Sequence, residues 1–324
     1  MREFRAMSIT TRRDFARGAL GLTAAASLAA AKPNSKFGGV QIGAITYSFR
    51  ALPGSAEETL KYCVDCGISA VELMSTPAES YAGAPLPAQG RPGARQKMTP
   101  EQQTAMKKAA DDLKQWRLAA KMDKYKAFRQ MYEAAGVKIY AFKLPPTMAM
   151  SDAEYDYIWN VAHTLGADHI TMELPTDDAL LKRVADFAAQ RKLRIAFHTH
   201  GQGGSSGFDR VLNASKFTAL NFDVGHYFGV NGESPVPLVE KYHERISSLH
   251  LKDRKGPAGP DDKRGGPNMP WGQGQTPLKD VLLTMKKHKY RFPASIEYEY
   301  ETPAGSDVLA EIKKCVAYCQ STLS

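Results

Sequence analysis

Five apolar runs in the second half of the chain end in acidic residues or histidines, the side chains that bind metal ions and move protons. They end in Met172-Glu173, Phe197-His198-Thr199-His200, Phe222-Asp223-Val224-Gly225-His226, Leu249-His250-Leu251-Lys252 and Ile296-Glu297-Tyr298-Glu299. Gathering so many ionisable groups without a cation would be costly, so the pattern predicts a shared divalent-metal site. Carboxylates with imidazoles suit Mn²⁺, Mg²⁺, Co²⁺ or Zn²⁺, and the absence of cysteine from these runs disfavours a structural zinc site.

These side chains can share one site only if the strands that carry them run parallel. Eight strand-like runs recur, at Val40–Phe49, Ala70–Met74, Lys138–Lys143, His169–Leu174, Arg194–His198, Ala219–Phe222, Ile246–Leu251 and Ala294–Tyr298. Most are followed by an amphipathic stretch, and this alternation favours parallel βαβ units. Eight such units predict an α/β fold, a single-domain (β/α)₈ TIM barrel over residues 37–320, whose strands end at one common mouth. Because strand residues two apart face the same way, His198 and His200 form one same-face pair.

The first 31 residues have the pattern of a targeting segment rather than of a folded element. Thr11-Arg12-Arg13-Asp14-Phe15 precedes an apolar run of small residues that ends in Ala29-Ala30-Ala31. A basic start, a short apolar stretch and an Ala-x-Ala end predict a secretory signal over residues 1–31. The paired arginines resemble the twin-arginine export signal, which implies a periplasmic or otherwise exported protein. The alternative, an amphipathic helix, lacks the charged face that such a helix needs.

Composition narrows the classes of partner. The chain of 324 residues is 43% hydrophobic and 24% charged, and its mean hydropathy of −0.39 argues against a membrane protein. Its net charge of +9 is spread without a long basic run or a basic stripe interleaved with aromatic residues, so nucleic-acid binding is poorly supported. We therefore expect a small-molecule substrate, no nucleic acid and no membrane contact once the signal is removed. A homo-oligomer is left open.

Three of the strand ends resemble motifs of a known enzyme group. Phe-Asp-Val-Gly-His at 222–226, Leu-His-Leu-Lys-Asp at 249–253 and Ser-Ile-Glu-Tyr-Glu at 295–299, in this order, resemble the xylose-isomerase-like sugar phosphate isomerase/epimerase superfamily. The resemblance covers the whole barrel and implies a divalent metal held by two glutamates, one aspartate and one histidine. It assigns Asp223, His250 and Glu297 to three of these ligands. It also assigns His226 to a contact with the substrate.

The fourth ligand is where the chain departs from many relatives. They carry a glutamate on the fifth strand, where this chain has His198, and the nearest glutamate is Glu173, one strand earlier. We take Glu173 as the expected ligand and His198 as its competitor. The His-x-His of the fifth strand with this glutamate resembles a subgroup that includes inosose dehydratase and 3-keto-sugar enzymes. Mn²⁺ is the expected ion, with Mg²⁺, Co²⁺ or Zn²⁺ as alternatives.

The chemistry implied by the resemblance removes a proton from the carbon next to a carbonyl of a sugar or keto-sugar. A bound metal stabilises the resulting enediolate as a Lewis acid. A glutamate of the last strand would act as the base, and a residue of the fourth or fifth strand would return a proton or protonate a leaving group. The candidate catalytic residues are Glu173, His198, His200, Glu297 and Glu299. The candidate substrate-binding residues, which would hydrogen-bond substrate oxygens or hold an anion, are Lys143, His226 and Lys252.

Several outcomes of that chemistry remain open from the sequence. Proton return gives an epimerase or an isomerase, which is the expected function, whereas loss of a β-oxygen gives a lyase or dehydratase. A non-catalytic sugar-binding protein that uses its metal only to hold the ligand is a further alternative. A DNA-repair endonuclease of the same superfamily is disfavoured because no basic groove is indicated.

The four cysteines lie on two predicted helices. Cys63 and Cys66 belong to the first helix of the barrel, and Cys315 and Cys319 belong to the last. Neighbouring helices in an oxidising compartment could be joined by a disulfide. The alternative is four half-buried helix thiols.

Overall fold

A computed structural model describes residues 32–86, 98–202, 204–259, 262 and 264–324. The described residues belong to one compact unit, Lys32–Ser324. The predicted signal segment, residues 1–31, lies outside the described residues, so export stays a prediction. No helix within the described ranges is both long and apolar enough to cross a membrane.

Eight parallel strands form the closed barrel that the alternation of strands and helices predicts. They are β2 (Val40–Ile45), β3 (Ala70–Met74), β4 (Lys138–Lys143), β5 (His169–Glu173), β6 (Arg194–His198), β7 (Thr218–Asp223), β8 (Ile246–Leu251) and β11 (Ala294–Ile296). Their order is β2-β11-β8-β7-β6-β5-β4-β3, and the pairing of β2 with β3 closes the ring. Two short antiparallel additions are β1 (Lys36–Phe37) on β2, and β9 (Asp253–Arg254) with β10 (Asn268–Met269). The predicted (β/α)₈ fold is confirmed.

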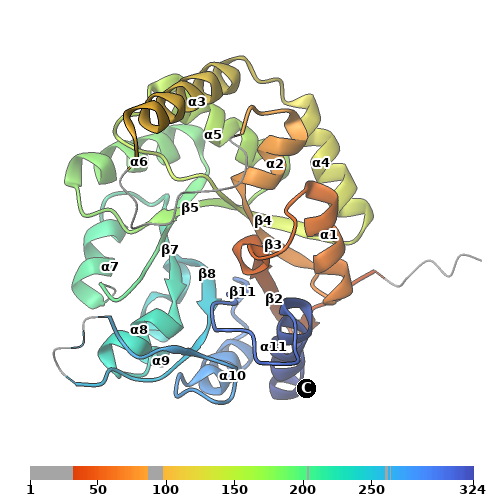
Figure 1. The fold of residues 1–324 in the computed structure, drawn as a ribbon. Coiled ribbons are helices and arrows are strands. Elements are labelled where there is room, and N and C mark those ends of the chain that lie inside the picture. Colours follow the sequence, from red (N-terminus) through yellow and green to blue (C-terminus); the bar gives the residue numbers. More distant parts are fainter. Residues whose placement is uncertain (1–31, 87–97, 203, 260–261, 263) are drawn as a thin grey trace, which may run out of the picture. The chain divides into compact units, whose positions relative to one another are not determined.

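Helices surround the strands in Figure 1. They are α1 (Ala56–Asp65), α2 (Ser75–Ala82), α3 (Pro100–Ala119), α4 (Asp123–Ala134), α5 (Asp152–Leu165), α6 (Asp178–Arg191), α7 (Ser205–Leu212), α8 (Val224–Asn231), α9 (Val236–Tyr242), α10 (Leu278–His288) and α11 (Val308–Leu323), with short 3₁₀ turns at Thr46–Phe49 and His243–Arg245. Three begin with a capping box, in which the hydroxyl of Ser55, Thr99 or Ser151 satisfies a free amide of the first turn. Such caps fix where the chain turns from loop to helix.

Polar side chains line part of the barrel interior, and their hydrogen bonds join strands that are not neighbours. Glu72 on β3 accepts from Thr171 on β5, from Asn221 on β7 and from His250 on β8. The apolar residues that alternate with these, such as Leu73, are buried and contribute to the hydrophobic core. The polar layer lies directly below the carboxyl ends of the strands.

The four cysteine thiols are buried and free. Cys66 on α1 contacts the backbone carbonyl of Leu309 on α11 at 3.7 Å, so the first and last helices are neighbours as predicted. The thiols nevertheless form no bridge, which agrees with the alternative of unpaired helix cysteines.

Candidate active site

Four side chains at the ends of consecutive strands converge at the carboxyl end of the barrel. His198 ends β6, Asp223 ends β7, His250 lies on β8 and Glu297 follows β11 directly. Each offers one ligand atom, and these atoms all lie within 4.8 Å of one another. All four residues are buried, with at most 6% of Glu297 exposed. We call this group the floor cluster, and its spacing fits a single bound ion.

Glu173, the expected fourth ligand, lies outside the floor cluster. Its side chain is 50% exposed, and its carboxylate accepts from Lys143 Nζ at 3.0 Å and from His200 Nε2 at 2.8 Å. Burial opposes ionisation of this carboxyl, but the hydrogen bond from His200 and the charge of Lys143 hold its pKa below the usual range. The structure therefore brings His198, the competing ligand, into the cluster instead of Glu173. We call Lys143, Glu173 and His200 the rim trio.

Asp223 supplies the clearest indication that the floor cluster suits a cation. It caps α8, because its Oδ1 accepts from the backbone amide of His226 at 2.7 Å. Its other oxygen, Oδ2, is buried and accepts no hydrogen bond from any described residue. Lys252 Nζ lies 3.1 Å from Oδ2, close enough for attraction but not aligned to donate. A buried carboxylate oxygen without a donor is costly, and coordination to a metal would remove that cost.

The two histidines of the floor cluster have opposite electrostatic surroundings. Burial lowers the pKa of His198 to about 4, and the positive charge of His250 adds to the effect. Burial would also lower the pKa of His250, but the carboxylates of Glu72 and Glu297 raise it to about 10. His250 donates from Nδ1 to Glu297 at 2.8 Å and from Nε2 to Glu72 at 2.7 Å. Three buried carboxylates, those of Glu72, Glu297 and Asp223, thus converge on this site against the charges of His250 and Lys252, and the excess of negative charge favours a bound cation.

The predicted substrate-binding residues lie against the floor cluster. Lys252 is 2% exposed, and its Nζ lies 2.6 Å from Glu299, 2.8 Å from Glu297 and 2.9 Å from His226 Nε2. On the other side of the His226 ring, Arg254 Nη1 lies 2.8 Å from Nδ1. Burial and these two cations lower the pKa of His226 to about 3, so its ring is neutral.

A second group of histidines shares a member with the floor cluster. Ring nitrogens of His198, His200 and His226 lie within 4.8 Å of one another. However, this group offers no carboxylate, and its His226 lies between Lys252 and Arg254, whereas the floor cluster offers two carboxylates to balance Lys252. We therefore assign the ion to the floor cluster alone.

Sequence reasoning missed Glu72 and Asn221, which lie beneath the floor cluster. Both are fully buried, and Asn221 contacts Glu72 and His198. Burial raises the pKa of Glu72, whereas the positive charge of His250 lowers it. The net result is a pKa of about 2. The only signal in the sequence was a charged residue in the middle of the apolar run Ala70–Met74, where a strand covered on both sides normally has none.

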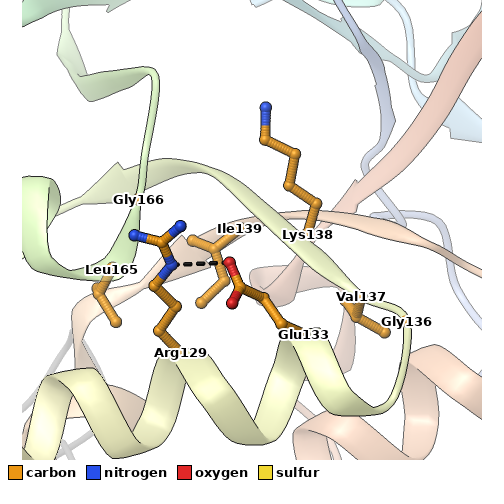
Figure 2. A pocket seen from close by; sticks show the side chains of 8 residues that line it. All are labelled: Arg129, Glu133, Gly136, Val137, Lys138, Ile139, Leu165 and Gly166. Atoms are coloured by element: carbon orange, nitrogen blue, oxygen red, sulfur yellow. Dashed lines mark hydrogen bonds and ion pairs between the residues drawn. The ribbon is translucent and has the colours of Figure 1, made fainter.

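A surface pocket lies at the opposite end of the barrel. It has a volume of about 250 Å³ and lies at the start of β4. Figure 2 shows its lining residues, with the ion pair between Arg129 and Glu133 beside Gly136 and Gly166. A wider cavity of about 770 Å³ also lies at the amino ends of the strands. Neither cavity is lined by a predicted site residue, so neither competes with the floor cluster.

Comparisons with known proteins identify the family of the chain. The family model described as xylose isomerase-like TIM barrel matches residues 60–317. An inosose dehydratase from Clostridium botulinum is 33% identical over 78 residues, which is 22% of this chain and 26% of that protein. The chain thus spans about a quarter of the length of the curated relatives that it matches.

Two solved structures share the fold at low sequence identity. The probable 3-DHS dehydratase from Bacillus anthracis has a TM-score of 0.58 at 13% identity and covers 86% of this chain and 99% of its own. The IOLI protein, solved with a bound zinc atom, has a TM-score of 0.56 at 13% identity and covers 88% and 99%. At these identities the likeness shows the fold alone.

Proposed function

The chain belongs to the xylose isomerase-like TIM barrel family, and from that premise we propose that it is a metal-dependent dehydratase of keto-sugars or related polyhydroxy ketones. The observation that carries the proposal is the hydrogen-bonded pair of His200 and Glu173. Both side chains are half exposed, and they lie beside the buried floor cluster. An elimination needs such an accessible acid for its leaving group. Isomerase or epimerase chemistry is the second candidate, because Glu297 and Glu299 place two carboxylates directly after the last strand, β11.

The floor cluster would hold the ion through His198, Asp223, His250 and Glu297. A divalent metal supplies Lewis-acid polarisation of the substrate carbonyl, which makes the neighbouring C–H bond more acidic. Two imidazoles with two carboxylates suit Mn²⁺, Co²⁺ or Zn²⁺ better than Mg²⁺, which prefers oxygen ligands. The zinc atom in the IOLI structure supports the assignment of a metal of this class.

Glu299 is the better placed of the two candidate bases. Its side chain is 21% exposed, whereas that of Glu297 is 7% exposed and accepts from His250. Lys252 donates to Glu299 at 2.6 Å and holds its carboxylate at the mouth. Glu299 would take the proton from the carbon beside the carbonyl. The electron pair of that C–H bond forms a carbon–carbon double bond and expels the hydroxyl from the β-carbon.

The hydrogen bond to Glu173 raises the pKa of His200 and favours its imidazolium form. This imidazolium would give its Nδ1 proton to the departing hydroxyl, so that the hydroxyl leaves as water and His200 is left neutral. Its Nε2 donates to Glu173 at 2.8 Å, and its ring centre lies 5.0 Å from that of His198 and 4.5 Å from that of His226. The ring thus lies at the edge of the floor cluster, oriented by Glu173. General acid catalysis by a positioned histidine contributes typically about 10²–10⁴-fold to a rate.

The electrostatics of the mouth support an uncharged substrate. Lys143 and Lys252 are the lysines predicted to hold an anion, and both already contact carboxylates. A phosphate would have to compete with Glu173, Glu297 or Glu299 for them. We therefore propose an unphosphorylated substrate.

The test is an incubation of the metal-loaded enzyme with inosose and with linear keto-sugars in D₂O, followed by NMR. The expected result is exchange of the C–H beside the carbonyl together with loss of one hydroxyl as water. Exchange with epimer or isomer formation and no loss of water would replace the dehydratase by the second candidate. Absence of both exchange and turnover, with metal bound, would favour a sugar-binding protein.

We propose further that residues 1–31 direct export by the twin-arginine route. The paired arginines and the small apolar run that follows support this. Replacement of Arg12 and Arg13 by lysine should hold the protein in the cytoplasm on cell fractionation. Unchanged export of that variant would argue for a different signal.

A further inference from the structure

We propose that Glu72 and Asn221 are positioning residues that select which ring nitrogen each floor histidine presents to the ion, Nε2 of His198 and Nδ1 of His250. The proposal rests on the metal assignment made above. It concerns residues on β3 and β7 that touch neither substrate nor ion. Their role follows from counting donors and acceptors in a fully buried network.

Glu72 is the anchor of the network because a carboxylate can only accept hydrogen bonds. Its Oε1 accepts from Thr171 at 2.7 Å, and its Oε2 accepts from His250 Nε2 at 2.7 Å and from Asn221 Nδ2 at 2.9 Å. His250 must therefore carry a hydrogen on Nε2. Without an ion, Nδ1 also carries a hydrogen, which it donates to Glu297. A bound ion would displace that hydrogen and leave the one on Nε2 in place, so Nδ1 is the nitrogen that can present a lone pair to the floor cluster.

The same carboxylate fixes the orientation of the Asn221 amide. Its NH₂ group must face Glu72, and it also lies 2.8 Å from Ser248 Oγ. The amide oxygen is thereby directed at His198 Nδ1, at 2.9 Å, and it can only accept. His198 must carry its hydrogen on Nδ1, which leaves the Nε2 lone pair on the side of Asp223, whose Oδ2 lies 4.0 Å away.

The burial of this pair argues that it serves more than packing. Glu72 and Asn221 are both 0% exposed, and they lie on strands that are not neighbours in the sheet. A buried carboxylate is generally no better for stability than an apolar residue of similar size. In metal sites, a partner that holds the second ring nitrogen of a histidine ligand sets its tautomer and orientation, and its loss typically costs about 10–100-fold in metal affinity.

The experiment measures Zn²⁺ and Co²⁺ affinity of the full chain by competition with a chromophoric chelator. Glu72→Leu should weaken binding at least tenfold, and Glu72→Gln, which can still accept from His250, should recover part of that loss. Ser295→Ala is the matched control, since Ser295 is equally buried and its hydroxyl hydrogen-bonds Tyr140 across the barrel, while only its backbone, which the substitution keeps, pairs with His250. It should change affinity less than twofold.

A second readout keeps the proposal open to refutation even if Glu72→Leu fails to fold. In ¹⁵N-histidine NMR spectra of the Zn²⁺-loaded wild type, His198 should bind through Nε2 and His250 through Nδ1. The opposite nitrogen at either histidine would overturn the proposal, as would equal affinities for Glu72→Leu and Ser295→Ala. Wild type that binds no ion at all would remove the metal assignment as well, whereas normal wild-type binding with unaffected variants would overturn the positioning role alone.

Discussion

The floor cluster and the rim trio lie side by side at the mouth of the barrel, yet they differ in their exposure to solvent. The residues of the floor cluster are at most 6% exposed and contact one another or Lys252. In the rim trio, the side chains of Glu173 and His200 are each 50% exposed. A buried ligand set is held rigidly by its surroundings, while an exposed pair can follow a substrate and exchange protons with water.

This difference in exposure suggests two separate roles for residues that the sequence shows only as a series of polar strand ends. The floor has the ligand types and the rigidity to hold an ion. In the proposed function, the rim supplies the acid for the leaving group through His200, whose ring is hydrogen-bonded to the Glu173 carboxylate. If the separation is real, substitutions in the two groups should have separable effects on metal content and on turnover.

The largest effect is expected from the floor. Asp223→Ala or His250→Ala should weaken metal binding by more than about 100-fold, the upper end for a residue that only supports a ligand, and should abolish turnover. Metal content by elemental analysis and loss of substrate by NMR are the two measurements. Full metal content with normal turnover in both variants would contradict the assignment of the floor cluster.

A smaller effect is expected from the rim, and it should leave the metal in place. His200→Ala should lower kcat for water loss by about 10²–10⁴-fold, the usual contribution of a general acid. Exchange of the C–H beside the carbonyl should persist, because His200 acts on the leaving group and not on that proton. His163→Gln, on an exposed histidine of α5, is the control. Loss of metal from His200→Ala would contradict the separate roles of the floor cluster and the rim trio.

The sequence could predict the barrel and the five strand ends because both follow from local patterns. Strand and helix periods are visible within each segment, and the rule that parallel strands share one mouth then places Asp223, His250 and Glu297 together. It favoured Glu173 over His198 as the fourth member, whereas the structure groups His198 with the other three. Glu173 and His198 pair directly across β5 and β6, and only the closed barrel shows that one side chain turns inward to the cluster while the other bonds to Lys143 and His200.

Glu72 lay beyond sequence reasoning for a related reason. It is 178 residues from His250 in the chain, and only closure of the ring brings β3 opposite β8. Nothing in the local sequence of Ala70–Met74 or of Ile246–Leu251 indicates that the two strands contact each other. By contrast, Glu297 and Glu299 are only two residues apart in the chain, and both carboxylates contact Lys252 just beyond the end of β11.

The smallest effect is expected from Lys143, which supports the rim from β4. Its ion pair with Glu173 involves a carboxylate that is half exposed, so water screens much of the attraction. Lys143→Gln should raise KM about two- to fivefold through a less ordered Glu173 and His200, with metal content unchanged. Lys138→Gln is the matched control, because Lys138 begins the same strand and pairs with Asp168 at 2.8 Å at the opposite end of the barrel. Since that end carries none of the predicted site residues, the control should leave KM unaltered, and an equal rise in both variants would mean that Lys143 acts only through the net charge of the protein.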